Sequence, residues 1–397
     1  MTRYRVAHII TTFSKSSGAA ENTKLTVNLL DRTRFDVFLA TPPRESMVAE
    51  LAPDVTHVPL SCLRRAINPF ADLLAFSELY GSIRRSRFDL VHTHNAKDGI
   101  LGRWAARLAR TPAIVHTIHN VSFQASTSPL LNRHYAMQER LAARFTDRLL
   151  AVSTDNAAKY LRNRIGRPEQ YRTVYSGLEL ARYIDDGRPA AERRAALGLP
   201  PDVGPWVGWV GRFNPQKDPL TFVRAAQFVK AQVSGVRFVV CGDDPIKPSL
   251  QAETRALIAE LGLGEVMHFL GFRPDLTNVL RGVDVVMHSS RHEGMGRVIC
   301  EALACERPVA GTAVDGVTEV IDSGRRGGVL VAPGDPIALA QAAVLLLTDP
   351  PLARTLARRG REWVTQNLSA DGMVRAIEQV YLELLTRTRT KQSNPSL

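Results

Sequence analysis

The chain has 397 residues, of which 45% are hydrophobic and 23% are charged, and its formal net charge is +12. This length exceeds the range in which one hydrophobic core keeps growing, so two domains are expected. No apolar run approaches the roughly 18 residues of a membrane-spanning helix, and the N-terminus lacks the apolar segment of a signal peptide, so a cytoplasmic location is expected. Four cysteines without CxxC spacing are expected to be free thiols, which excludes a disulfide framework.

In the first half of the chain, short apolar runs alternate with longer amphipathic runs. The predicted strands are residues 6–12, 35–41, 90–93, 113–117 and 149–152, and the predicted helices are residues 21–30, 72–85, 99–109 and 154–162. This alternation predicts βαβ units and a parallel sheet. A segment rich in glycine, proline and charge follows at 176–189 and is predicted to be a linker.

A second alternating series begins after the linker. Its predicted strands are residues 206–210, 236–241, 266–270, 283–287, 309–311 and 328–331, and its predicted helices are 219–230, 250–261, 297–305 and 336–347. A last helix is expected at about 371–388, and the polar residues 389–397 are expected to form a flexible tail. Because ligands of open α/β sheets bind beyond the carboxyl ends of the strands, the residues that bind or react with a ligand are expected at those ends.

The basic residues are concentrated in the first half of the chain. Residues 1–190 have a charge balance of +10, and the remainder has only +2. No nucleic-acid motif is present, so an anionic membrane surface is the better candidate for the partner of this half. The segment 63–87 mixes apolar residues with Arg64, Arg65, Arg84, Arg85 and Arg87, and it is either a core-packed helix with solvated arginines or a peripheral membrane contact.

The segment 291–301 contains two glutamates eight positions apart, Glu293 and Glu301, around Gly294, Met295 and Gly296. Glycines at a helix start let backbone N–H groups approach a ligand, and the helix dipole favours an anion there. Ionised carboxylates accept hydrogen bonds from the hydroxyls of a sugar and a ribose. The pattern therefore predicts a pocket for a nucleotide sugar, and the alternative is a loop-to-helix turn with two solvated glutamates.

The segment 207–219 follows a predicted strand and precedes a helix. Arg212 and Lys217 lie five positions apart across this loop, so both can reach one diphosphate, Arg through its planar fork and Lys as a point charge. We refer to this pair as the phosphate clamp. The alternative is a pair of solvated surface cations.

The spacing of the two glutamates resembles the E-x7-E signature of the family-4 retaining glycosyltransferases, which have the GT-B fold of two Rossmann-like domains facing across a cleft. The Gly-Arg…Lys loop resembles the phosphate clamp of that family. The resemblance implies that Glu293 faces the donor sugar, that Glu301 binds ribose hydroxyls, and that the backbone at Gly294, Met295 and Gly296 contacts sugar and phosphate. It adds Val298 to the donor-binding residues, together with Phe272 and Arg273 at the nucleobase.

A histidine at the end of a predicted strand, His119, matches the active-site histidine of the same family. His92 and His94 end the preceding strand and are expected to share one face, because alternate strand residues do so. Together with His116, these histidines could also form a zinc site, but neither spacing is a familiar metal-binding pattern and the family uses no metal there.

The loop before the first helix resembles the Gly-Gly-Ala-Glu loop of the family, which meets the donor phosphate and the acceptor. Here Gly18 is followed by Ala19, which casts doubt on close backbone approach at that position. Two further departures from the family pattern are Ser176, in place of an asparagine at the hinge, and the sequence 241–245, in place of Gly-Asp-Gly-Pro. The similarity is strongest over 206–330, and the region 89–155 looks most like exopolysaccharide-assembly members.

The resulting expectation is a GT-B enzyme with an acceptor-side domain at 1–177, completed by the terminal helix, and a donor-binding domain at 178–370. It would transfer a sugar with retention from a nucleotide diphosphate to a lipid-linked or growing glycan. The catalytic residues would be His119, Arg212, Lys217 and Glu293, and no cofactor or metal is expected, since no Asp-x-Asp motif is present. The alternatives are a soluble small-molecule acceptor, a nucleotide-sugar 2-epimerase and an inactive binding protein, while the missing GxGxxG fingerprint argues against a nicotinamide oxidoreductase.

Overall fold

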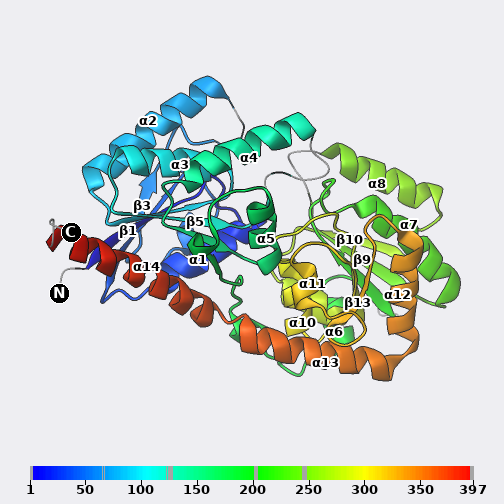
Figure 1. Ribbon diagram of the computed structural model, residues 1–397. Helices are drawn as coiled ribbons and strands as arrows, with labels where there is room; N and C mark the ends of the chain where they lie inside the picture. Colours follow the sequence, from blue (N-terminus) through cyan, green and yellow to red (C-terminus); the bar gives the residue numbers. More distant parts are fainter. Residues whose placement is uncertain are drawn as a thin grey trace. The chain divides into compact units, whose positions relative to one another are not determined.

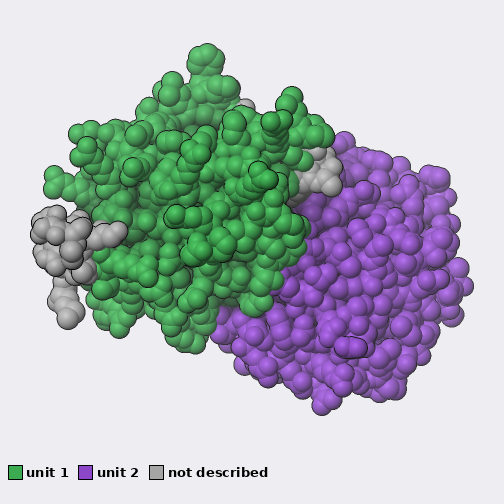
Figure 2. Space-filling model, viewed as in Figure 1, with its two compact units in different colours: residues 1–177, 370–397 green, residues 178–369 purple. Residues whose placement is uncertain are grey.

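The computed structural model describes residues 3–64, 66, 68–121, 123, 128–200, 204–243 and 248–393. The chain divides into two compact units (Figure 2). Unit 1 comprises Met1–Gly177 and Ala370–Leu397, and unit 2 comprises Leu178–Ser369. Each unit is an α/β domain built on a fully parallel sheet (Figure 1).

Unit 1 contains a seven-stranded sheet with the order β3-β2-β1-β4-β5-β6-β7. The strands are β1 (Tyr4–Ile9), β2 (Phe35–Thr41), β3 (Thr56–Pro59), β4 (Leu90–His94), β5 (Ala113–Ile118), β6 (Arg148–Ala151) and β7 (Tyr171–Thr173). The helices are α1 (Gly18–Leu29), α2 (Pro69–Ser86), α3 (Lys97–Leu108), α4 (Pro129–Ala143), α5 (Thr154–Arg162) and α14 (Ala370–Ser393). The order reverses between β1 and β4, as in a Rossmann fold, and that reversal marks the usual ligand position.

Two hydrophobic clusters cover the two faces of the unit 1 sheet. One cluster packs Ala7, Ile9 and Ala40 of the sheet against Leu79 and Ile83 of α2. The other packs the opposite side chains of the same strands against α1 and α14, whose Val380 and Tyr381 are buried. Because strand side chains alternate between faces, β1 contributes to both clusters. The helix α14 continues to Ser393, into the segment expected as a tail, and residues 394–397 lie outside the described residues.

Unit 2 contains a six-stranded sheet with the order β10-β9-β8-β11-β12-β13. The strands are β8 (Trp206–Val210), β9 (Arg237–Cys241), β10 (Met267–Gly271), β11 (Val285–His288), β12 (Val309–Thr312) and β13 (Gly328–Val331). The helices are α6 (Ala190–Ala196), α7 (Pro219–Gln232), α8 (Pro248–Glu260), α9 (Leu276–Gly282), α10 (Arg297–Ala304), α11 (Val317–Val320), α12 (Pro336–Thr348) and α13 (Pro350–Asn367). The strand order reverses between β8 and β11, so the carboxyl ends of these two strands mark the switch point of unit 2.

Short 3₁₀ turns complete the two units. They are Val48–Glu50 and Pro168–Gln170 in unit 1 and Leu180–Tyr183 in unit 2, the last within the predicted linker. Over the described residues, no single helix is both long and apolar enough to span a membrane. Only α12 and α13 taken together satisfy that test, and they are bent by 101°.

Candidate functional site

The switch point of unit 2 is formed by two loops that hydrogen bonds hold together. One loop follows β8 and runs to Asp218, and the other follows β11 and runs to Gly296. The Ser289 hydroxyl donates to the carbonyl oxygens of Lys217 and Asp218 at 2.8 and 2.9 Å, and Arg291 N donates to Gln216 O at 2.8 Å. These contacts fix the two predicted motifs, which are 76 positions apart, into one site.

Lys217 and Glu293 meet at the centre of this site. The Lys217 ammonium donates a hydrogen bond to Glu293 Oε1. The same oxygen accepts from the Ser290 hydroxyl at 2.8 Å and lies 3.1 Å from His288 Nε2, while Glu293 N donates to Asp315 Oδ2 at 2.6 Å. Burial by itself would raise the pKa of the Glu293 carboxyl, but the charge of Lys217 and the hydrogen bonds from His288 and Lys217 together outweigh burial and hold the pKa well below its usual range. The site therefore presents an ionised carboxylate at neutral pH.

The second glutamate of the motif, Glu301, lies on α10 in unit 2. Its Oε1 accepts from the Tyr183 hydroxyl at 3.2 Å and from Arg297 Nε at 3.0 Å. The helix begins after Gly296, whose φ of 77° suits glycine. A Cβ there would also lie 3.1 Å from Ile299 Cδ1, a contact that a small shift of that side chain could relieve, so the backbone conformation is the main reason for glycine at this position.

Glycines bring the ends of β8, β9 and β10 close together. Gly242, with a φ of 134°, passes so close to β8 that an added Cβ would lie 2.0 Å from Gly211 O. Gly242 N donates to Gly271 O at 2.7 Å. Asp244 and Pro245 of the same motif lie outside the described residues. The half-buried Arg212 follows Gly211, so the phosphate clamp stands at the carboxyl end of β8.

The predicted nucleobase residues follow β10. Phe272 is 41% exposed, and Arg273 Nε donates to Asp275 Oδ1 at 2.9 Å. Gly294, Met295 and Val298 lie at or next to the start of α10, and the first two are buried. The structure thus places the clamp and the E-x7-E residues at one switch point, and it places Phe272 and Arg273 at the end of a neighbouring strand.

In unit 1, His119 follows β5 and is half-buried. Its Nε2 lies 3.0 Å from His94 Nδ1, and His94 Nε2 lies 3.0 Å from His8 Nδ1. His116 lies on the opposite face of β5 and pairs with Thr93 Oγ1 at 2.9 Å. Burial lowers the pKa of His119 to about 3. The predicted site histidine is therefore neutral and tied to two further histidines.

The loop before α1 follows β1 at the switch point of unit 1. The Ser17 hydroxyl accepts from Ala20 N at 3.3 Å and caps the helix that begins at the exposed Gly18. Ser176, which stands where the family has an asparagine at the hinge, has a hydrogen-bond partner within unit 1. Its hydroxyl accepts from Asn22 Nδ2 at 3.1 Å. The helix start after Gly18 has the form of an anion-binding terminus.

Sequence reasoning missed several residues at these sites. His288, Ser290 and Asp315 surround Glu293, and Tyr183 reaches Glu301. For His288 and Ser290, the one available sequence signal was their position at the end of a strand. Tyr183 lies more than a hundred positions from its partner, and no sequence signal joins the two.

A buried carboxyl group, Asp98 on α3, was also missed. Its Oδ2 accepts from Thr11 N at 2.7 Å, and its Oδ1 has no hydrogen-bond partner among the described residues. Burial raises the pKa of Asp98 to about 7. This carboxyl group therefore titrates near neutral pH beside the loop that leads to α1.

Among the described residues, one group of three side chains has the geometry to hold a metal ion. His8, His92 and His94 offer nitrogen atoms within 4.8 Å of one another, and all three residues are buried. His92 and His94 share one face of β4, as predicted, and their ring centroids are 4.4 Å apart.

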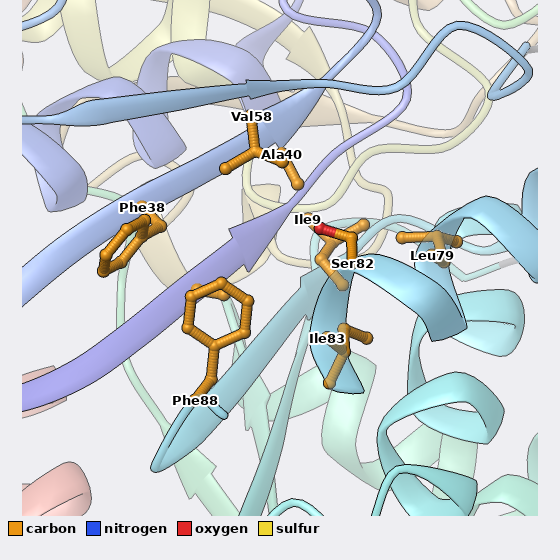
Figure 3. Close-up of a pocket in the computed structure, with 9 residues that line it drawn as sticks. Ile9, Phe38, Ala40, Val58, Leu79, Ser82, Ile83 and Phe88 are labelled. Carbon is orange, nitrogen blue, oxygen red and sulfur yellow. The ribbon is translucent and has the colours of Figure 1, made fainter. Parts of the chain in front are cut away.

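An apolar pocket in unit 1 is separate from these groups (Figure 3). It lies between the sheet and α2, where Phe38, Phe88 and Leu79 line it and Ser82 is the one polar side chain among its nine lining residues. This pocket offers no titratable group to a ligand.

Comparison with known proteins assigns the chain to a family. Residues 17–182 match the family described as Glycosyltransferase Family 4, and residues 204–349 match Glycosyl transferases group 1. The D-inositol 3-phosphate glycosyltransferase of Saccharomonospora viridis is 31% identical over 375 residues, covering 88% of this chain and 84% of that protein. The Escherichia coli UDP-Gal:alpha-D-GlcNAc-diphosphoundecaprenol alpha-1,3-galactosyltransferase is 26% identical over 359 residues, covering 90% and 91%.

Solved structures confirm the predicted fold. Anabaena HepE, crystallised with UDP-glucose, superposes with a TM-score of 0.83 at 21% identity, covering 96% of this chain and 99% of HepE. WaaG, a glycosyltransferase involved in lipopolysaccharide biosynthesis, superposes with a TM-score of 0.76 at 18% identity, covering 94% and 98%. The chain belongs to the family-4 glycosyltransferases, also described as glycosyl transferases group 1, and is a nucleotide-sugar-dependent enzyme of class EC 2.4 with the GT-B fold.

Proposed function

We propose that this enzyme transfers a sugar with retention from a UDP-sugar to a lipid-linked acceptor in cell-surface polysaccharide assembly. The observation that carries the proposal is the Lys217–Glu293 ion pair at the switch point of unit 2. It combines a cation for a diphosphate with an ionised acceptor for sugar hydroxyls. The E. coli relative, whose name specifies a UDP-sugar and a diphosphoundecaprenol acceptor, supports this donor and acceptor.

The leaving group of the reaction is a nucleoside diphosphate, and its developing charge needs stabilisation. Lys217 and Arg212 supply fixed positive charge, and the backbone N–H groups from Gly294 to Gly296 lie at the positive end of α10. Preorganised donors of this kind usually contribute the largest part of catalysis. We therefore infer that turnover requires no bound metal ion.

The two glutamates divide the recognition of the donor. Glu293, ionised and held by Lys217, accepts hydrogen bonds from the donor sugar, and Glu301 accepts from the ribose hydroxyls. Phe272 and Arg273 contact the nucleobase, Val298 packs at the start of α10, and Gly18 meets the donor phosphate. His119 hydrogen-bonds to an oxygen of the donor sugar.

The acceptor proposal is supported by an exposed stripe on α2. Phe70, Leu73 and Leu74 are 84%, 65% and 60% exposed, and Arg84 and Arg85 are exposed on the same helix. Leu73, Leu74, Arg84 and Arg85 follow Phe70 by 3, 4, 14 and 15 positions, which places all five on one side of α2. A helix with exposed apolar residues at one end and arginines at the other suits the surface of an anionic membrane, where the lipid-linked acceptor resides. Arg65 lies outside the described residues.

The proposal is tested by incubating the purified chain with labelled UDP-galactose, UDP-glucose or UDP-N-acetylglucosamine and two acceptors, a GlcNAc-diphospholipid and inositol 3-phosphate. We expect transfer to the lipid acceptor, retention of the anomeric configuration by NMR, and full activity in EDTA. Transfer only to inositol 3-phosphate would favour a soluble acceptor, which the S. viridis relative supports. Epimerised UDP-sugar would indicate a 2-epimerase, and binding without turnover would indicate an inactive protein.

A further inference from the structure

A continuous file of hydrogen-bonded side chains runs from His119 into the core of unit 1. We refer to it as the histidine array, and its members in order are His119, His94, His8, Tyr381, His92 and Thr117. The Tyr381 hydroxyl lies 3.2 Å from His8 Nε2 and 2.5 Å from His92 Nδ1. His92 Nε2 lies 2.7 Å from Thr117 Oγ1. With the two 3.0 Å contacts among His119, His94 and His8, every link is within hydrogen-bond distance.

The array follows from the strand order of unit 1. β1, β4 and β5 are neighbours, and His8 lies directly opposite His92 in the register of β1 and β4. Alternation puts His94 on the same face as His92, and this face is covered by α14, which supplies Tyr381. Four elements, β1, β4, β5 and α14, therefore contribute to one row of polar side chains inside an apolar core.

All four imidazoles of the array are neutral. Burial lowers the pKa of His8 and of His119 to about 3 and holds the pKa values of His92 and His94 well below the ordinary range. Burial likewise raises the pKa of the Tyr381 phenol well above its ordinary value, so it keeps its proton. A neutral imidazole has one N–H donor and one bare acceptor nitrogen, so the protons of the file must all point the same way.

Thr117 decides which way they point. Its hydroxyl is almost fully buried and, among the described residues, has His92 Nε2 as its one partner. If Thr117 accepted from His92, its own hydrogen would be left buried without an acceptor, which costs roughly 1–3 kcal/mol. Thr117 therefore donates to His92 Nε2. His92 Nδ1–H then donates to the Tyr381 hydroxyl, that hydroxyl donates to His8 Nε2, and His8 Nδ1–H donates to His94 Nε2. At the end of the file, His94 Nδ1–H donates to His119 Nε2.

We propose that the histidine array sets His119 as a neutral imidazole that presents an Nδ1–H donor to an oxygen of the donor sugar. Among the described residues, this nitrogen has no hydrogen-bond partner of its own. His8, His92, His94, Thr117 and Tyr381 are then positioning residues, and His119 is a hydrogen-bond donor, not a general base. The inference rests on the proposed contact between His119 and the donor sugar.

A metal ion held by His8, His92 and His94 is the competing interpretation of the same cluster. Each nitrogen that links the array already has a hydrogen-bond partner, and the array contains no carboxylate to offset the charge of a buried divalent cation. Both features favour a row of neutral, hydrogen-bonded side chains whose protons all point the same way over a metal site.

The direct test is the tautomer of His119, measured by 15N NMR on protein labelled at histidine, with His119→Gln used to assign the signals. We expect a neutral Nδ1–H tautomer that does not titrate between pH 5 and pH 9. An Nε2–H tautomer, or titration near pH 6.5, would overturn the proposal. So would the finding of about one zinc ion per chain in the purified enzyme.

A kinetic test separates the array from the proposed function. Tyr381→Phe removes the hydroxyl that joins the two halves of the file, and we expect about a tenfold loss of kcat together with a mixture of His119 tautomers. Tyr171→Phe is the matched control, because it removes a partly buried tyrosine hydrogen bond to Ile165 O in the same unit, outside the array. Equal kcat in the two variants would refute the positioning role.

His119→Ala addresses the sugar contact itself. This variant should bind UDP-sugar about tenfold more weakly and UDP with unchanged affinity. Unchanged UDP-sugar affinity would remove the proposed function of His119, whereas the tautomer measured in the wild-type protein would still decide whether the array sets its protonation.

Discussion

The Lys217 ammonium and the Glu293 carboxylate form a partly buried ion pair that joins the loop after β8 to the loop after β11. Each residue lies at the carboxyl end of a strand beside the switch point, so the pair forms part of the scaffold as well as of the proposed donor site. This double role shapes the first two predictions.

Removal of either cation of the phosphate clamp should abolish most of the activity. Lys217→Ala and Arg212→Ala are expected to lower kcat about 100-fold or more, comparable to the loss of one preorganised donor. Lys230→Ala, on the exposed face of α7, is the matched control and should leave kcat unchanged. Near-wild-type turnover in both clamp variants would exclude the assignment.

The two glutamates should affect different kinetic constants. Glu301→Ala should mainly raise KM for the donor, since a ribose contact is made equally in the ground and transition states. Glu293→Ala should mainly lower kcat, because contacts at the reacting sugar can change between those states. Steady-state kinetics with varied donor will decide, and the opposite pattern would show that the two roles are exchanged.

Unit 1 should lose stability as the pH falls below about 6.5. Six histidines, His8, His57, His92, His94, His116 and His119, have pKa values lowered chiefly by burial, so below pH 6.5 the unfolded state binds more protons than the folded state. Asp98 acts in the opposite direction, because its raised pKa of about 7 adds stability as the pH falls from 7 towards 4. One carboxyl group is outweighed by six imidazoles.

Hydrogen exchange of unit 1 peptides at pH 7.5, 6.0 and 5.0 measures this effect. The free energy of global opening should decrease with each step, and His116→Val should reduce the number of protons taken up on unfolding by about one. A stability that is constant over this range would contradict the buried, neutral state of the histidines.

A buried ion pair between α3 and α4 should be sensitive to removal of one partner. Arg103 donates to Glu139 Oε2 at 2.7 Å, and both side chains are almost completely buried. Glu139→Gln or Arg103→Met should destabilise unit 1 by about 3–5 kcal/mol, since a buried charge is left alone. The double variant Arg103→Met/Glu139→Met should recover much of this loss in urea unfolding. Additive losses would show that the two side chains are not energetically coupled and would contradict this prediction.

The exposed stripe of α2 should bind anionic membranes. Each arginine near such a surface contributes about 1 kcal/mol, so co-sedimentation with anionic vesicles is expected at low salt and should be lost at high salt. Substitution of Arg84, Arg85 and Arg87 by Ser, or of Phe70, Leu73 and Leu74 by Ser, should weaken it. Substitution of the exposed Ile337 and Leu345 of unit 2 by Ser is the control. Failure of the wild-type chain to bind would favour a soluble acceptor.

The sequence determined the fold through its pattern. Alternating apolar runs and amphipathic helices predicted two parallel sheets, and E-x7-E with the Gly-Arg…Lys loop predicted the family, which the comparisons confirm. The short edge strands β3 and β7 and the helices α4, α6, α9, α11 and α13 were not predicted. Edge strands of three or four residues carry little periodicity. The start of α4 does carry a signal, Ser128 as N-cap followed by Pro129, which sequence reasoning overlooked.

Only the tertiary structure decided which side chains meet. The sequence gives no indication that His288, Ser290 and Asp315 surround Glu293, or that Tyr381 joins His8 to His92 across 289 positions. Periodicity reports which face of an element is buried, because neighbouring residues share one backbone geometry. Strand order and helix packing decide which buried faces share a layer, and they depend on contacts distant in the chain. The proton order of the histidine array follows from those contacts alone.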